Sequence, residues 1–401
     1  MLYPKKHNNI WEFPVHHMRG GTSTGLVIWE DIAPQQTELR EELLRHLMGV
    51  PLIGEQPGNR QITGLGRGPA TSNKVFFATL EQSDQGLRLV STLAQLAAEH
   101  GRIDWSVNCG NMSSALQIWA IHTGQIDARA AGAHTLEIFN TNTGVSTTSR
   151  VMIDSDGQFS TAEIPGVMGL HPAVDLFLHN PVGAKTGTLL PTGNATDVID
   201  GCRVSCVDVA VPMVIIRAED MSKTATESMQ ALEADPHFMT RLKVIWTAAG
   251  LKMQLRHKDG RLLTADELAA SETIPKVCIV AAPQDGGDIA VRYFTPQTGH
   301  NSMAVSGGCC LAAATLIPGS VAHDIAGKSL SAEATEQFIG IENPAGILGA
   351  SVISRHTPEG IDIQQAAYQR SAQVLLQGYM PLYGASPALQ QALAEISQLP
   401  R

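Results

Sequence analysis

A cysteine stands where proteins commonly place a group that moves protons. Cys109 lies in the segment NCGNM (Asn108–Met112), directly before an apolar stretch with helical spacing. The helix dipole stabilises a thiolate at such a position. A thiolate accepts a proton and its thiol donates one, so Cys109 is a candidate acid–base group. A buried structural cysteine is the alternative, and the spacing alone leaves both open.

A lysine offers a second candidate. Lys74 follows a TSN turn and precedes the apolar strand pattern VFFATL. Removal of water from its amine would lower the pKa and make the amine a base. A lysine that points to solvent at the start of a strand is the commoner alternative.

Two glycine-rich segments accompany these residues, Met18–Gly25 (MRGGTSTG) and Gly64–Lys74 (GLGRGPATSNK). Glycine lets backbone N–H groups approach a ligand closely, and N–H groups at a helix start attract anions. Pro69 and a strand follow the second segment, which therefore fits neither a dinucleotide fingerprint nor a Walker A loop.

The elements that must position these residues form a repeated pattern. Each half of the chain has strand patterns, then a Gly/Cys turn, then a helix that is apolar on nearly every side. The main ranges are the strands 26–29, 74–80, 87–93, 135–140, 204–218, 277–282 and 289–294, the helix 113–122 and the helix that follows SGGCC. A helix without a polar face must be surrounded by protein. We therefore expect an α+β fold of two pseudo-symmetric domains, each a curled, mostly antiparallel sheet around a central buried helix.

The domain boundary is expected near Asn194–Asp200, which is rich in turn-forming residues. The first domain then covers residues 1–195, completed by the C-terminal segment 371–401. The second domain covers residues 196–370.

Composition limits the function. The 401 residues include 28 Lys plus Arg and 38 Asp plus Glu, a net charge of −10, which argues against nucleic-acid binding. Neither a secretory nor a membrane-spanning segment is visible, so we expect a cytoplasmic protein that does not bind membranes. Cys202-x3-Cys206 lacks a matching ligand pair, and the histidines show no metal-ligand spacing, so no metal is expected.

Taken together, MRGGTS, TSNK and NCGN resemble the PrpF family, the methylaconitate isomerase group related in fold to diaminopimelate epimerase and proline racemase. The second half continues the resemblance. GHNSMAVSGGCCLAAA is similar to the family's MHKxxAVTGAxCxAAA, NPAGIL to HPSGxI, and YQRSAQVLLQG to RTARxLxxG. Order and spacing match over nearly the whole chain.

The resemblance implies an isomerase without cofactor or metal, similar to 2-methylaconitate isomerase or 4-oxalomesaconate tautomerase. Such an enzyme moves a proton and a double bond, by cis–trans or 1,3-allylic isomerisation, in a small unsaturated di- or tricarboxylic acid. Its active site would lie in the cleft between the domains of a monomer or homodimer.

By the same resemblance, Lys74 and Cys109 exchange protons with the substrate. The residues expected to bind the substrate are Arg19, Gly21, Thr22, Ser23, Thr71, Ser72, Asn108, Gly110, Asn111, Met112, His300, Ser302, Ser306, Gly307 and Gly308.

The sequence departs from the family pattern at four positions. Thr24 stands where the family usually has Lys or Arg, Asn301 replaces the Lys of MHK, and Asn343 and Ala345 replace the His and Ser of HPSG. Charge-assisted hydrogen bonds are roughly twice as strong as neutral ones, so these changes matter for a polyanion. Either the substrate has fewer or differently placed carboxylates, or basic residues such as Arg60 or Arg67 compensate.

Two other functions stay open. One is an amino-acid racemase or epimerase that uses two cysteines, since Cys309 or Cys310 stands near the pseudo-symmetric position to Cys109. The other is a non-catalytic carboxylate-binding protein.

Overall fold

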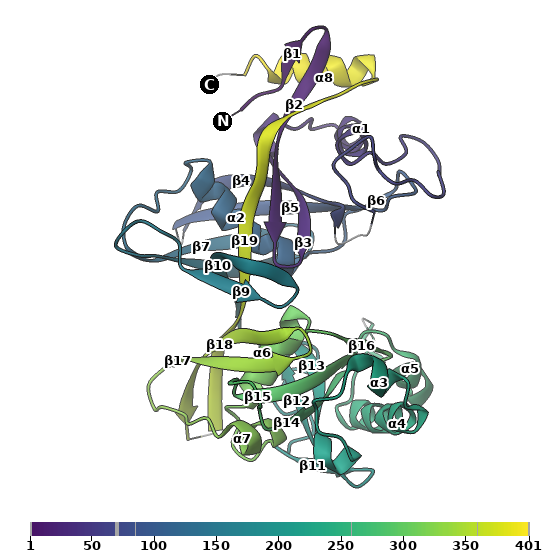
Figure 1. Cartoon of the computed structure of the whole chain (residues 1–401), viewed down its shortest axis with the longest axis vertical. Helices are drawn as coiled ribbons and strands as arrows, with labels where there is room; N and C mark the ends of the chain where they lie inside the picture. The colour runs from purple at the N-terminus through teal and green to yellow at the C-terminus, as the bar shows by residue number, and fades with distance from the viewer. Residues whose placement is uncertain (1, 69–71, 85, 258, 359, 400–401) are drawn as a thin grey trace. The chain divides into compact units, whose positions relative to one another are not determined.

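The computed structural model describes residues 2–68, 72–84, 86–257, 259–358 and 360–399. It divides the chain into two compact units (Figure 1). The first unit comprises Met1–Glu163, Val167–Leu176 and Arg370–Arg401, and the second comprises Ile164–Gly166 and Phe177–Gln369.

The first unit is a curled sheet around one helix. Its elements are β1 (Lys5–His7), β2 (Ile10–Gly20), β3 (Ser23–Trp29), α1 (Thr37–Met48), β4 (Lys74–Ser83), β5 (Gly86–Leu96), β6 (Ile103–Asp104), α2 (Gly110–His122), β7 (Gly132–Asn140), β8 (Val145–Ile153), β9 (Thr161–Ile164), most of β10 (Val167–His179), the end of β19 (Gly360–Pro381) and α8 (Pro387–Ile396). Leu116 and Trp119 of α2 are fully buried, because the apolar sides of the helix pack into the sheet around it.

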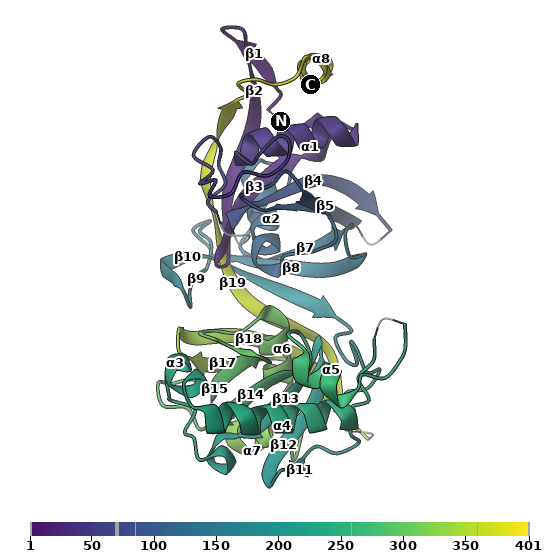
Figure 2. The same ribbon diagram turned by 90° about the vertical axis from the view of Figure 1, so that its right-hand side faces the viewer.

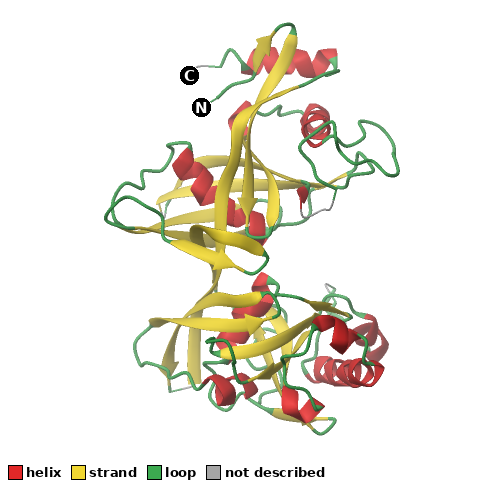
Figure 3. Ribbon diagram, viewed as in Figure 1, coloured by secondary structure: helices red, strands yellow, loops and turns green. Residues whose placement is uncertain are grey.

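The second unit has the same plan. Its elements are β11 (Asp197–Ile199), β12 (Cys202–Val209), β13 (Val211–Arg217), α3 (Met229–Glu233), α4 (Pro236–Lys252), α5 (Ala265–Ala270), β14 (Lys276–Ala281), β15 (Ile289–Thr295), β16 (Thr298–His300), α6 (Val305–Ala314), α7 (Val321–Ala326), β17 (Thr335–Asn343), β18 (Gly346–Thr357) and the start of β19. Residues Gly307 to Ala314 of α6 are all buried. The segment SGGCC, which the sequence predicted as a turn before this helix, therefore lies within the helix itself. Figure 3 shows that strands dominate both units.

Strand pairing shows the repeat directly. In the first unit β2–β3 is antiparallel, β3–β4 parallel, β4–β5 antiparallel, β5–β7 parallel and β7–β8 antiparallel. In the second unit β12–β13, β13–β14, β14–β15, β15–β17 and β17–β18 follow the same alternation. The buried helices α2 and α6 stand at corresponding places in this order. The expected α+β fold of two similar sheets, each around a buried helix, is confirmed.

The second unit adds a helical layer on the other face of its sheet (Figure 2). Phe238, Leu242 and Trp246 of α4 pack with residues of β12, β13 and β14 in a separate apolar cluster. Among the described residues, no helix is long and apolar enough to cross a membrane.

Residues 177–195 belong to the second unit, whereas the sequence-based boundary places them in the first. Their attachment explains the difference. The buried carboxylate of Asp208, on β12, accepts hydrogen bonds from the backbone N–H groups of Lys185 and Thr186, each at 2.8 Å.

Candidate active site

Lys74 and Cys109 lie close together in the first unit. Lys74 is the first residue of β4 and only 5% exposed. Burial lowers the pKa of its amine, and a negative charge on the nearby Cys109 sulfur acts in the opposite direction. The structure thus brings together the two residues predicted to move protons and removes water from the amine.

Cys109 is the N-cap residue of α2, with φ −132° and ψ 99°. Its thiol is free and half-buried. The Asn108 side-chain oxygen accepts a hydrogen bond from the Cys109 N–H at 2.7 Å, which fixes the turn before the helix. The next N–H groups, from Gly110 to Met112, belong to the first helical turn, where no intrahelical acceptor exists. Cys109 therefore stands beside backbone donors that favour an anion.

The turn between β2 and β3 packs against this first turn of α2. A Cβ atom on Gly20 would lie 2.4 Å from the Asn111 carbonyl oxygen, and one on Gly21 would lie 2.3 Å from Asn111 Oδ1. Gly21 also has a left-handed φ of +52°. Only glycine permits this approach. The MRGGTS glycines are therefore required for backbone packing at the site.

Of the predicted polar residues near this turn, Thr22 contacts Asn111. Asn111 Nδ2 donates to the Thr22 hydroxyl at 3.3 Å, while Asn111 Oδ1 is buried without a hydrogen-bond partner among the described residues. Ser23 is buried at the start of β3, and Met112 is buried in the core. Ser72 lies half-buried two residues before Lys74. Thr71 lies outside the described residues.

Arg19 uses its guanidinium within the protein. Its Nε and Nη2 donate to Gln373 Oε1 at 3.1 and 2.9 Å, and its Nη1 donates to the carbonyl oxygens of Gly21 and Ser371. Burial lowers the pKa of this group. These contacts tie the β2–β3 turn to β19, which is a positioning role; the predicted carboxylate contact of Arg19 stays a prediction.

Arg370 was not among the predicted site residues. It is buried on β19, and its Cδ would lie 3.0 Å from a Cβ on Gly21. It therefore brings a second arginine to the same turn. The YQRS segment matched the family pattern at Arg370. The spacing of residues, however, did not indicate that β19 pairs with β2.

A buried pair of side-chain amides was also missed. Gln61 Oε1 accepts hydrogen bonds from Asn73 Nδ2 at 2.9 Å and from the Gly68 N–H at 2.6 Å. Gln61 Nε2 donates to the Met48 carbonyl oxygen, and Asn73 Oδ1 accepts from the Arg67 N–H. The pair anchors the GLGRG loop directly before Lys74.

The predicted residues of the second unit gather before and within the first turn of α6. The Ser302 N–H donates to His300 Nδ1 at 2.9 Å, and the His300 ring meets the Tyr293 ring edge to face. A Cβ on Gly307 would clash with Tyr293, and one on Gly308 with Tyr368. The Gly308 N–H already donates to the Ala304 carbonyl oxygen. These glycines therefore let the helix pack on two aromatic rings; Ser306 lies half-buried in the first turn.

Three of the four departures from the family pattern meet in this unit. The Ala345 N–H donates to the Asn301 carbonyl oxygen and to Asn343 Oδ1, both at 3.0 Å. The fourth, Thr24, has a buried hydroxyl without a hydrogen-bond partner among the described residues. Asn343 and Ala345, at the β17–β18 turn, thus contact the backbone of Asn301, and all three residues are neutral.

A racemase or epimerase with two catalytic cysteines would need a second cysteine at the position in α6 that corresponds to Cys109, and none stands there. The N-cap of α6, which corresponds to Cys109, is Ala304. Cys309 and Cys310 lie fully buried further along α6, and burial raises the pKa of the Cys310 thiol. Among the described residues, no group of three or more His, Cys, Asp or Glu side chains is arranged to hold a metal ion.

Comparison with known proteins places the chain. The model of the PrpF protein family matches residues 10–383. The 4-oxalomesaconate tautomerase of Pseudomonas putida KT2440 is 33% identical over 365 residues, which cover 90% of this chain and 93% of that protein. The (4E)-oxalomesaconate Delta-isomerase of Novosphingobium sp. strain KA1 is 30% identical over 379 residues, which cover 94% of this chain and 99% of that protein.

A solved structure agrees with these relatives. The crystal structure of methylitaconate-delta-isomerase superposes with a TM-score of 0.77 at 25% identity, covering 95% of this chain and 97% of that one. The resemblance found in the motifs thus extends over nearly the whole sequence and fold, and the chain belongs to the PrpF family.

Proposed function

We propose that this chain is an isomerase that moves a proton and a double bond in a small unsaturated di- or tricarboxylic acid. Relatives that match nearly the full chain carry the names of isomerases and a tautomerase of such acids. The observation that carries the proposal is a buried lysine amine beside a cysteine at the start of a buried helix.

Lys74 is the proposed base. A C–H next to an unsaturated acid or ketone loses its proton only to a neutral amine or an equivalent base. Because burial lowers the pKa of Lys74, a larger fraction of its amine is neutral than in water. A positioned base of this kind contributes roughly 10²–10⁴-fold to the rate.

Cys109 is the proposed proton donor. Once the proton has left, negative charge spreads over the conjugated system to a carboxylate or ketone oxygen. N–H groups of the first turn of α2 and the side chain of Asn111 would stabilise that oxyanion. The Cys109 thiol then returns a proton at another carbon of the system, which shifts the double bond or allows rotation about it.

The β2–β3 turn and the first turn of α2 would bind one carboxylate. Thr22 and Asn111 offer polar groups there, Arg370 adds a buried cation beside Gly21, and Arg19 holds the turn in place. The contacts proposed for Ser23, Ser72, Asn108, His300, Ser302 and Ser306 follow the family pattern. The same holds for the cleft between the domains, the absence of cofactors and the oligomeric state, all of which stay predictions.

The neutral residues Asn301, Asn343 and Ala345, which lie together in the second unit, bear on the substrate. A polyanion held by lysine elsewhere in the family would meet neutral groups here, so we infer a substrate with fewer or differently placed carboxylates. Thr24→Lys combined with Asn301→Lys should then raise turnover of tricarboxylates over dicarboxylates. An unchanged ratio in steady-state assays would count against this inference.

A substrate panel tests the proposed function. Turnover of aconitates, 2-methylaconitate, methylitaconate and 4-oxalomesaconate is followed by ultraviolet absorbance with the wild type, Lys74→Ala and Cys109→Ala, and with Lys6→Ala as an exposed-lysine control. One acid should be isomerised, with a loss of about 10²-fold or more in Lys74→Ala. Full turnover by Lys74→Ala would overturn the assigned base, and binding without turnover would favour a carboxylate-binding protein.

A further inference from the structure

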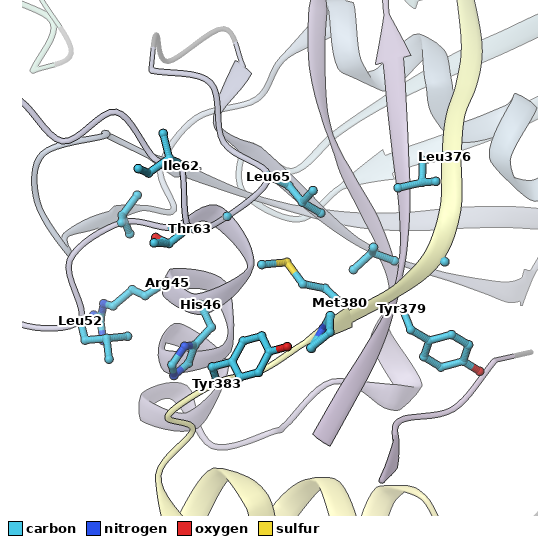
Figure 4. Close-up of a pocket in the computed structure, with 16 residues that line it drawn as sticks. Arg45, His46, Leu52, Ile62, Thr63, Leu65, Leu376, Tyr379, Met380 and Tyr383 are labelled. Atoms are coloured by element: carbon cyan, nitrogen blue, oxygen red, sulfur yellow. The ribbon is translucent and has the colours of Figure 1, made fainter. Parts of the chain in front are cut away.

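A long groove runs along the first unit between strands and a loop. Two adjoining cavities of about 780 and 840 Å³ share Ile62, Gly64, Leu65 and Leu376 in their walls. Figure 4 shows Ile62 and Leu65 on the loop side and Leu376 and Met380 on the side of β19. Volumes of this size are typical of small-molecule sites.

This groove lies on the opposite face of the sheet from Lys74 and Cys109. His16 of β2 points toward α2, since its ring meets the Trp119 ring at 6.1 Å. Successive residues of a strand point to opposite faces, so His17 points away from α2. His17 lines the groove and pairs in register with Leu376. The groove is therefore separate from the candidate active site.

The wall formed by the loop is closely built. A Cβ on Gly64 would lie 2.1 Å from the Gly49 nitrogen, and one on Gly66 would lie 2.0 Å from Gln61 Nε2. Gln61 itself has a left-handed φ of +56° and is buried. The loop is thus held against the end of α1 by contacts that tolerate no larger residue. The GLGRG pattern serves this packing, and the loop presents Arg60 and Arg67 at one end of the groove.

That end of the groove carries unpaired positive charge. Arg60 and Arg67 are exposed, and neither guanidinium forms an ion pair or hydrogen bond with a described residue. Arg40, Arg45 and Arg102 of the same unit are each paired with a glutamate. Two guanidinium groups without a partner in the described part of an acidic protein attract an anion when they stand in one wall.

His17 adds a buried polar group to the same end. It is 5% exposed, and its Nε2 has no hydrogen-bond partner in the part of the chain that the structure describes. Burial and the positive charge of Arg67 lower the pKa of its imidazole. A neutral imidazole beside two guanidinium groups can donate to a carboxylate without adding charge.

The other end of the groove is apolar and open. Ile62 is 85% exposed, Tyr383 72% and Leu376 51%. The register of β19 against β2 shifts between Val374 and Leu376, so a β-bulge turns both Leu375 and Leu376 toward the groove. Exposed apolar residues gathered in a groove mark a binding site.

We propose that this groove binds a free small-molecule carboxylate with an apolar body. Arg60 and Arg67 take the carboxylate, His17 donates to it, and the body lies along Leu65, Leu376 and Met380. Charge complementarity selects the anion, because no described residue pairs a carboxylate with either guanidinium group. The apolar wall excludes small polyanions that lack a hydrophobic part.

Binding of octanoate tests the proposal by calorimetry and saturation-transfer NMR. Octanol lacks the charge and citrate lacks the apolar body, so both should bind at least tenfold more weakly. Arg60→Gln combined with Arg67→Gln, and separately Leu376→Asp, should each weaken octanoate at least tenfold. Arg102→Gln, which removes an exposed arginine already paired with Glu55, should bind as the wild type does.

Two further measurements distinguish binding in this groove from binding at the candidate active site. Lys74→Ala should bind octanoate as tightly as the wild type, since the catalytic lysine faces the other side of the sheet. The pKa of His17, followed by histidine NMR, should rise when octanoate binds, because a nearby negative charge favours the imidazolium.

The proposal is overturned if millimolar octanoate does not bind or if octanol binds equally well. Unchanged binding by the Arg60/Arg67 double variant would also overturn it. A wild type that sediments as a dimer, which Leu376→Asp dissociates, without octanoate binding would show that the groove is an interface between copies instead.

Discussion

The side-chain amides of Gln61 and Asn73 meet at 2.9 Å in the interior of the first unit, where both residues are at most 1% exposed. Asn73 directly precedes Lys74, and its Nδ2 also donates to the Gly68 carbonyl oxygen. This pair therefore fixes where β4 starts and with it the direction of the Lys74 side chain.

Replacing Asn73 with Ala should destabilise the protein and slow turnover. The change removes the acceptor of the Arg67 N–H and one of the two donors to Gln61 Oε1, which keeps only the Gly68 N–H. A buried group that stays unsatisfied costs about 1–3 kcal/mol. Chemical denaturation and kcat measure the two effects. Gln82→Ala, at an exposed position of the same strand, is the control and should change neither; equal behaviour of the two variants would contradict the positioning role.

A methyl group on Gly20 should damage the candidate site. The Cβ of Gly20→Ala would lie 2.4 Å from the Asn111 carbonyl oxygen, so either the β2–β3 turn or the first turn of α2 must move. A misplacement of catalytic groups by about 1 Å can lower the rate by about 10²-fold. Gly378→Ala is a matched control, because no atom lies within 4 Å of its Cβ position. Comparison of kcat/KM for the two variants gives the result, and equal activity would argue against close packing at Gly20.

The rate should rise with pH as Lys74 loses its proton. Burial puts the pKa of this amine below its usual 10.5, and only the neutral amine accepts a proton. We expect kcat/KM to increase with pH over the range in which Lys74 loses its proton and Cys109 is still a thiol, because the proposed mechanism needs both the neutral amine and the thiol proton. Lys74→Arg keeps a positive charge at every pH and should lack this rise. A rise of the same size in Lys74→Arg would assign the pH dependence to another group.

Stability should fall as the pH drops from 6.5 toward 4 because of His16. Burial lowers the pKa of His16 to about 4, and the neighbouring His122 acts in the same direction. Below pH 6.5 the unfolded chain takes up a proton that the folded protein excludes, so the free energy of unfolding decreases. When His16 is fully protonated in both the folded and the unfolded state, this pKa difference lowers the free energy of unfolding by roughly 3 kcal/mol.

Denaturation curves across this range measure the effect of His16. The His16→Gln variant should show a flatter pH dependence than the wild type. His237→Gln, at an exposed position of α4, serves as the control. A slope that His16→Gln leaves unchanged would show that other groups cause the acid sensitivity.

The sequence alone was enough to show that each half contains a buried helix and to place the start of the first one near Cys109. The start of the second was wrong, because SGGCC lies inside α6 and not in a turn before it. α2 and α6 have no polar side, and that pattern requires a surrounding sheet. Lys74 and Cys109 stand at the start of a strand and of a helix, where local pattern is informative. Their proximity followed from the family resemblance.

Long-range contacts account for what the sequence did not show. The residue type and motif of Arg19 suggested that it binds a ligand. In the structure its guanidinium donates hydrogen bonds to Gln373 and Ser371, which lie far along the chain and could not be identified from the sequence. Asn301 and Ala345 meet for the same reason. The sequence suggested that Cys309 corresponds to Cys109. In the structure the corresponding N-cap residue of α6 is Ala304. The periodicity of apolar residues shows which face of a helix or strand is buried. It does not show which distant strand pairs with that element.

Proton NMR in D₂O tests the central claim most directly. Wild type, Lys74→Ala and Cys109→Ala are incubated with each unsaturated acid, and deuterium entering the carbon skeleton is followed. Deuterium should enter one acid with the wild type, at positions joined by the shifting double bond, and should be absent with both variants. Isomerisation or exchange that persists in both variants would contradict proton transfer by Lys74 and Cys109.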